Sequence, residues 1–558
     1  MDADAIVVGG GLAGLVAACE LLEAGRRVIL LDQENAANLG GQAHWSFGGI
    51  FLVDSPAQRR LGVRDSLDLA WRDWQGSAAW DRVGVGLEDE WAVRWGRAYV
   101  EWAAGGKLAW LRAKGVRFTP MVGWAERGGA SASGHGNSVP RFHVAWGTGT
   151  GISEPFAARV RAAAVDGRLD WRPRHRVESL LLEGGAVVGV EGVVLAADDA
   201  PRGAPSSREA IASFALRAPT VLLATGGIGG EHDLVRAWWP ERLGTAPRRM
   251  VTGVPAYVDG SGIAVAERAG ARTVNRDRMW HYTEGLRNFA PVWPGHGIRI
   301  LPGPSSMWFD ALGRRLPAPL LPGYDTLATL RHLRTTPDLV EHDHSWFVLN
   351  QAIIEKEFAL SGSEQNPDIT SGRWSEVLRS RLGRGAPAPV EAFKRQGADF
   401  VVAEDLDGLV ASMNRLAGID ALDVGGLRRE IEARDAEMTN RYAKDAQVQG
   451  IHNARRFRGD RLLRVAKPHR ILDPAKGPLI AVRLNILTRK SLGGIQTDLE
   501  SRALTPDGSP LPGLWAAGEA AGFGGGGLHG YNALEGTFLG GCCFSGLAAG
   551  RSIAARTA

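Results

Sequence analysis

The sequence predicts an α/β protein that begins with a nucleotide-binding unit, and three observations support this class. An apolar strand at Ala5–Val8 leads through glycines into an apolar helix at Leu12–Glu23, and a second apolar strand at residues 27–31 ends at Asp32. A further glycine-rich segment follows at residues 38–50. The chain has 558 residues, enough for two domains or for one large domain with an insertion.

The glycine spacing after the first strand has a specific physical purpose. Gly9, Gly11 and Gly14 form the pattern GxGxxG. Gly9 allows a tight turn, Gly11 lets a pyrophosphate approach the N–H groups of the helix N-terminus, and Gly14 lets helix and strand pack closely. Asp32 stands where a carboxylate accepts hydrogen bonds from a ribose. Strand, glycines, helix, strand and acid in this order indicate a dinucleotide site.

The segment at residues 38–50, NLGGQAHWSFGGI, favours FAD over NAD as the dinucleotide. An NAD-binding fold needs no more bare backbone after its second strand, whereas a large flavin nucleotide lying along the chain does. His44 could serve as a covalent attachment point for the flavin, but a pocket or core histidine is the commoner interpretation.

Composition excludes several other classes. The formal net charge is +4 without a run of five or six basic residues, so nucleic-acid binding is not expected. Cys19, Cys542 and Cys543 form no CxxC or zinc spacing, which predicts no metal site and fits a reducing cytoplasm. No stretch of about 20 apolar residues is visible, so no integral membrane segment is expected.

The C-terminal part of the chain contains three motifs in order: GGIQTD at residues 493–498, PGLWAAGE at residues 512–519, and a glycine-rich loop at residues 524–541. PTVLLATGGIGG at residues 219–230 and DGSGIAVAERAGA at residues 259–271 precede them. Together these motifs resemble the family of fumarate reductase flavoproteins and 3-ketosteroid Δ1-dehydrogenases.

The resemblance implies a Rossmann-like FAD-binding domain of three-layer ββα architecture, built from both ends of the chain, with an inserted α+β catalytic domain. We expect the FAD-binding domain at residues 1–271 and 477–558, and the catalytic domain at residues 272–476. FAD is expected to bind noncovalently, because nothing around His44 matches the covalent-histidine motif of succinate dehydrogenases. The residues expected to contact FAD are Gly9, Gly11, Leu12, Ala13, Gly14, Asp32, Gln33, Gly40, Gly41, Gln42, Ser46, Gly48, Gly49, Ala224, Thr225, Gly226, Gly518, Glu519, Gly536 and Thr537.

Cationic positions separate the substrate classes of this family. Fumarate reductases bind a dicarboxylate with histidines and arginines, and the corresponding positions here are Tyr282, Tyr324, Lys490 and Ala533. A buried dicarboxylate would lack its counter-charges, which is very costly. Fumarate reduction is therefore disfavoured.

Ketosteroid dehydrogenases use tyrosines instead, and Tyr282, Tyr324 and Tyr531 fall at the expected pocket. The resemblance implies an FAD-dependent dehydrogenase acting on a CH–CH bond beside a ketone, in a steroid-like molecule, with hydride transfer to flavin N5. Tyr531 and the backbone N–H of Glu535 would polarise the ketone, while Tyr324 would remove the neighbouring proton. The family has glycine at the position of Glu535, so this carboxylate is a further candidate acid or base.

Two other functions stay open. A fumarate-reductase-like enzyme could reduce an enone or an unsaturated acid, with Lys490 as its cation. A flavoprotein electron carrier would need no substrate chemistry. The dehydrogenase or the reductase would act on a small-molecule substrate. Each would also need an electron acceptor or donor, which no motif identifies.

Overall fold

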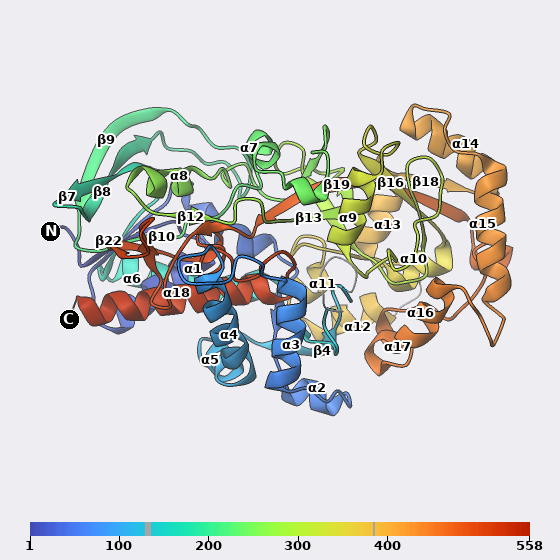
Figure 1. Ribbon diagram of the computed structural model, residues 1–558, viewed down its shortest axis with the longest axis horizontal. Helices are drawn as coiled ribbons and strands as arrows, with labels where there is room; N and C mark the ends of the chain where they lie inside the picture. Colours follow the sequence, from blue (N-terminus) through green and yellow to red (C-terminus); the bar gives the residue numbers. More distant parts are fainter. Residues whose placement is uncertain (129–135, 383–384, 558) are drawn as a thin grey trace.

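In a computed structural model the chain is described over residues 1–128, 136–382 and 385–557. Figure 1 shows two parts along the longest axis of the molecule. One part holds both termini, and the other is formed mainly by the middle of the chain.

A six-stranded sheet lies at the centre of the part that holds the termini. Its strands, in order across the sheet, are β21 (Arg502–Leu504), β22 (Pro510–Ala516), β10 (Val221–Leu223), β1 (Ala5–Val8), β2 (Val28–Leu31) and β6 (Leu169–Arg172). All neighbours are parallel except β21 and β22. Every residue of β1, β2 and β10 is buried, as expected for strands covered on both faces.

Different layers cover the two faces of this sheet. Helices α1 (Leu12–Glu23), α6 (Thr150–Val165) and α18 (Thr537–Arg556) pack on one face, where Ala5 and Val7 point. An antiparallel sheet of β7 (His175–Glu183), β8 (Ala186–Leu195) and β9 (Ala210–Arg217) packs on the other, where Ile6 and Val8 point. This arrangement confirms the expected three-layer ββα architecture.

Helix α18 packs closely along α1. A Cβ atom added at Gly546 would lie 2.4 Å from the carbonyl oxygen of Ala13, and one added at Gly550 would lie 2.9 Å from that of Ala17. Among the described residues, α18 is also the one helix that could cross a membrane by length and composition. However, 61% of its apolar window is buried inside the protein, so its packing is that of a core helix.

The second part of the molecule is built on an eight-stranded sheet. The path across it is β15 (Met307–Phe309), β16 (His344–Asn350), β19 (Leu479–Ser491), β13 (Met279–Arg287), β14 (Gly297–Leu301) and β17 (Ala359–Leu360), while β11 (Val251–Thr252) and β18 (Phe400–Ala403) pair with β19. β19 lies at the centre of this sheet, and β11 joins the sheet from a segment before residue 272. The expected domain boundaries at 271–272 and 476–477 stay predictions.

The remaining elements are shorter or peripheral. In the part with the termini they are β3 (Gly49–Phe51), β4 (Phe118–Gly123), β5 (Phe142–Ala145), β12 (Thr273–Val274), β20 (Gly494–Ile495), α2 (Pro56–Arg60), α3 (Leu67–Ala78), α4 (Glu90–Ala104), α5 (Lys107–Ala113), α7 (His232–Ala237) and α8 (Ser261–Arg268). In the second part they are α9 (Thr326–Thr335), α10 (Gln351–Glu357), α11 (Pro367–Thr370), α12 (Trp374–Leu382), α13 (Ala388–Gln396), α14 (Leu406–Ala417), α15 (Val424–Glu437), α16 (Ala446–Ala454) and α17 (Arg458–Leu463).

Candidate active site

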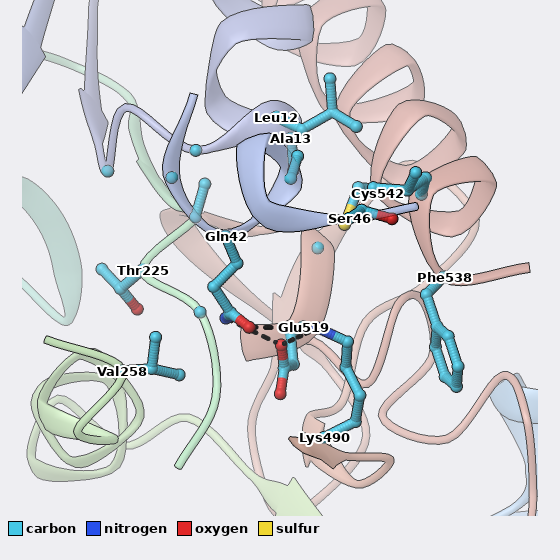
Figure 2. A pocket seen from close by; sticks show the side chains of 18 of the residues that line it. Leu12, Ala13, Gln42, Ser46, Thr225, Val258, Lys490, Glu519, Phe538 and Cys542 are labelled. Carbon is cyan, nitrogen blue, oxygen red and sulfur yellow. Dashed lines mark hydrogen bonds and ion pairs between the residues drawn. The ribbon is translucent and has the colours of Figure 1, made fainter. Parts of the chain in front are cut away.

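A cavity of about 210 Å³ lies at the carboxyl ends of β1, β2 and β10, where α1 and α18 begin. Ligands of open α/β sheets bind at this edge, outside the carboxyl ends of the strands. Figure 2 shows Leu12 and Ala13 of α1 and Phe538 and Cys542 of α18 around this space. The cavity continues to the second part, because Tyr282 of β13 and Arg299 of β14 also line it.

The cavity brings together most of the residues predicted to contact FAD. Those that line it are Gly9, Gly11, Leu12, Ala13, Asp32, Gln33, Gly41, Gln42, Ser46, Gly49, Ala224, Thr225, Gly226, Gly518, Glu519 and Gly536. Gly14, Gly40, Gly48 and Thr537 are not among the lining residues. Gly14 instead brings α1 against β1, since a Cβ there would lie 2.1 Å from the carbonyl oxygen of Gly9. Gly48 packs against Thr148 in the same way, and the Thr537 hydroxyl donates to the carbonyl of Leu534.

The end of the cavity near α1 fits a dinucleotide. Gly9 has a φ of +108°, which the tight turn requires, and no side chain caps the N-terminus of α1 at Gly11. The open helix terminus favours an anion such as a pyrophosphate. The buried Thr225 hydroxyl lines the cavity without a hydrogen-bond partner among the described residues, so a ligand's polar group would satisfy it.

Asp32 closes this end of the cavity. Its Oδ2 accepts from the backbone N–H of Gly10 at 2.7 Å, and its Oδ1 accepts from that of Glu34 at 2.8 Å. Burial raises the pKa of the Asp32 carboxyl to about 6. Hydroxyl groups that donate to this carboxylate would offset its burial, which is what a ribose offers.

Gln42, Lys490 and Glu519 meet in the middle of the cavity wall (Figure 2). Gln42 Nε2 donates to Glu519 Oε2 at 3.0 Å, and Lys490 Nζ donates to Gln42 Oε1 at 3.0 Å. Lys490 Nζ also lies 3.6 Å from Glu519 Oε2, and burial lowers the pKa of this ammonium group. The network therefore joins three distant segments of the chain around Glu519, one of the residues expected to contact FAD.

A second polar cluster lies where the two parts of the molecule meet. Arg299 Nη1 donates to Glu535 Oε1 at 2.8 Å, Arg299 Nη2 contacts Glu126 Oε1, and Arg299 Nε lies 3.9 Å from Glu284 Oε2. The guanidinium carbon lies 3.6 Å from the ring centroid of Tyr282. The Tyr282 hydroxyl donates to Glu535 Oε1 at 3.5 Å. Three carboxyl groups thus surround one buried guanidinium.

Burial sets the protonation of this cluster. It raises the pKa of the Glu284 carboxyl and raises that of Glu126 further, even though Arg299 opposes both shifts. Burial and the nearby Glu535 also raise the pKa of the Tyr282 phenol. Tyr282 is therefore a hydrogen-bond donor at neutral pH and not a base.

Three residues considered from the sequence lie outside the cavity. The Tyr324 hydroxyl lies beside Gly450 in α16, where an added Cβ would be 2.8 Å from it. The Tyr531 hydroxyl donates to the exposed Asp81, at 2.9 Å to Oδ2. His44 does not line the cavity either. The geometry does not support Tyr324 as the base or Tyr531 as the ketone-binding group, because neither lines the cavity.

Arg299 and its partners Glu126 and Glu284 were not predicted from the sequence. Arg299 stands between two isoleucines in the apolar strand GIRIL, and all five residues of that strand are buried. A single charge inside such a strand indicates a paired buried group, so this signal was available. Glu126 follows no comparable pattern, since a tertiary contact alone brings it to Arg299.

The fold and this cavity define the class of the protein as an FAD-dependent oxidoreductase. A family model described as "FAD binding domain" matches residues 4–539. The chain belongs to this family, which confirms the predicted fold class and cofactor.

Known proteins resemble the chain over nearly its whole length. A protein of Mycobacterium tuberculosis (strain CDC 1551 / Oshkosh), described as a KsdD-like steroid dehydrogenase, is 59% identical over 554 residues, covering 99% of this chain and 96% of the relative. The structure of 3-ketosteroid delta1-dehydrogenase from Sterolibacterium denitrificans has a TM-score of 0.65 at 16% identity, covering 99% of each chain. A flavocytochrome c3 fumarate reductase has a TM-score of 0.63 at 19% identity, covering 100% of this chain and 78% of that chain. The predicted family resemblance is confirmed, and the chain is an FAD-dependent dehydrogenase.

Proposed function

We propose that this dehydrogenase removes hydrogen from a CH–CH bond beside a ketone in a steroid-like substrate, with FAD bound noncovalently. The observation that carries the proposal is one continuous cavity that extends from Asp32 to Glu535. The 59% identity to a relative described as a steroid dehydrogenase supports the substrate class. Phe142, Phe523 and Phe538 also line the cavity and suit an apolar ring system.

The geometry of the cluster indicates which role each group has in this reaction. Bound FAD supplies the hydride acceptor. The Tyr282 hydroxyl stays protonated because its pKa is raised, and it would turn its one proton from Glu535 to the ketone oxygen of a bound substrate. The guanidinium group of Arg299 packs against the ring face of Tyr282 and forms an ion pair with Glu535. Phenylalanine side chains exclude water from the reacting carbons.

An unsaturated acid is a weaker candidate substrate. Lys490, Arg299 and Arg489 line the cavity, but each is already engaged. Lys490 binds Gln42 and lies near Glu519, Arg299 binds Glu535, and Arg489 donates to a backbone carbonyl. A substrate carboxylate would therefore have to displace an internal partner, and burying it unpaired is costly.

An anaerobic titration of the purified protein with a 3-ketosteroid tests the proposal, with the absorbance of the flavin as readout. We expect the steroid to bleach the flavin, and fumarate to leave dithionite-reduced flavin unoxidised. Reduction by dithionite alone is the control that the flavin is competent. A flavin that dithionite reduces but no 3-ketosteroid bleaches contradicts the substrate assignment and favours an electron carrier.

We also propose that the protein works in the cytoplasm. Its three cysteines are all unpaired, and Cys19 and Cys543 are buried. Unpaired thiols are typical of a reducing compartment. The electron acceptor that reoxidises FAD would then be a partner reached from that compartment.

A further inference from the structure

We propose that Glu535 is the group that takes the proton from the carbon beside the ketone, in place of a tyrosine. This inference rests on the proposed function and adds to it the identity of the base. It starts from the tyrosines: Tyr324 and Tyr531 lie outside the cavity, and Tyr282 is held as a phenol. A different group must therefore accept the proton.

Glu535 is the carboxyl group of the cluster that reaches the cavity. It stands directly before Gly536, the N-cap of α18, and only 8% of its side chain is exposed. Glu126 and Glu284 contact the same guanidinium but do not line this cavity. Tyr282 lies beside Glu535, so a ketone oxygen bound by the phenol places its neighbouring carbon close to this carboxylate.

The charge balance of the cluster favours a carboxylate at this position. One guanidinium compensates one of the three carboxyl groups, since two further buried charges would be costly. Burial raises the pKa values of Glu126 and Glu284, which favours their protonated forms. Glu535 pairs with Arg299 at 2.8 Å and is the partner of that guanidinium that lines the large cavity.

A route for the proton leads away from the cavity. A second cavity of about 20 Å³ is lined by Glu535 and Glu126, together with Ser77 and Asn532. Glu535 therefore lines both the large cavity and the small one. A proton accepted from the substrate could pass to the polar groups that line the small cavity.

The proposed step removes a proton and a hydride from neighbouring carbons of the substrate. The C–H bond beside the ketone breaks, and its proton forms an O–H bond with Glu535. The electron pair of that bond becomes the new C=C bond. FAD held in the cavity would accept a hydride from the next carbon and so supply the two-electron oxidant that the substrate needs.

Replacing Glu535 by glutamine, with Glu284→Gln as the matched control, tests the proposal. Both variants replace a carboxyl group beside Arg299 by an amide, but only the first changes the cavity wall. We expect Glu535→Gln to slow anaerobic flavin bleaching by a 3-ketosteroid by about 100-fold or more, as removal of an acid–base group does. FAD content and steroid affinity should stay within about threefold, and Glu284→Gln should lose less than about tenfold in rate. Equal losses in the two variants, or a Glu535→Gln rate near wild type, would overturn the proposal.

Two further measurements separate the possible failures. If Glu535→Gln does not retain FAD, Glu535→Asp keeps the acid one methylene shorter, and we expect a rate between those of wild type and a fully inactive protein.

If no ketosteroid bleaches even the wild-type flavin, the proposed function fails, and infrared difference spectra of dithionite reduction then test Glu535 alone. A carboxylic-acid band present in wild type and Glu284→Gln but absent in Glu535→Gln supports its role beside the flavin. Identical spectra in all three proteins contradict it.

Discussion

Replacing Arg299 by methionine removes the one guanidinium at the centre of three buried carboxyl groups. Methionine fills a similar space, so the change is mainly electrostatic. Removing one partner of a buried ion pair destabilises a protein by about 3–5 kcal/mol. We expect a loss in this range at neutral pH, and we expect the loss to depend on pH.

The sign of that dependence follows from proton binding. Glu126 and Glu284 already have raised pKa values in the folded protein, and without Arg299 a third carboxyl group must also take up a proton to fold. A carboxyl group whose folded pKa is raised contributes stability below its unfolded pKa of about 4.3, and this stability is lost as pH rises toward the folded pKa. Between its unfolded and its folded pKa, this third carboxyl group lowers the free energy of unfolding by about 1.4 kcal/mol for each pH unit. Between pH 6 and pH 8 the free energy of unfolding of the variant should therefore fall more steeply than that of wild type.

Urea unfolding of the FAD-loaded protein at these two pH values, followed by tryptophan and flavin fluorescence, measures both quantities. The double variant Arg299→Met with Glu535→Gln is the control, because it removes both charges of the 2.8 Å pair. We expect it to recover part of the stability and of the pH slope. A single variant that loses less than about 1 kcal/mol, or the same amount at both pH values, would refute the charge balance of the cluster.

Three further predictions concern the cofactor site and the tyrosines. Gly14→Val should reduce FAD affinity by about tenfold or more, because its Cβ would lie 2.1 Å from the carbonyl oxygen of Gly9; an unchanged ratio of flavin to protein absorbance contradicts this. Glu519→Gln should weaken FAD binding by about tenfold in calorimetric titration of the apoprotein, because a buried ammonium group then lacks its carboxylate, and an unaltered affinity argues against that role. Tyr282→Phe should slow steroid-dependent bleaching by about tenfold or more, whereas Tyr324→Phe should change it by less than about threefold, and the reverse order would restore Tyr324 as the base.

The nucleotide end of the site was predictable from sequence because its physics is local. Gly9, Gly11 and Asp32 lie within one strand–helix–strand unit, so spacing alone fixes their positions relative to one another. Glu519 was predicted from the family resemblance of the PGLWAAGE motif, in which it lies three residues after the end of the apolar strand β22.

The reacting end was less predictable because it is assembled from distant segments. Four separate places in the chain supply Glu126, Tyr282, Arg299 and Glu535. Tyr282 and Arg299 lie on the neighbouring strands β13 and β14, whereas Glu126 and Glu535 lie in loops. The position of Tyr531 in the glycine-rich loop matches a family pattern. Its hydroxyl nevertheless donates to the exposed Asp81 and does not line the cavity. Sequence spacing fixes where a residue lies along the chain, but not which way its side chain faces.

The close packing of α18 on α1 has a consequence for how the protein is made. Strand β22 and helix α18, at residues 510–516 and 537–556, complete the sheet edge and cavity that β1 and α1 begin. Synthesis proceeds from the N-terminus at about 5–20 residues per second. Some tens of seconds therefore pass between the synthesis of β1 and that of β22 and α18. During that interval no residue of α18 is available to cover the face of α1 that Gly546 and Gly550 contact in the folded protein. Cofactor capture is therefore a late event, and chaperone binding to the nascent N-terminal unit would protect it until the final helix leaves the ribosome.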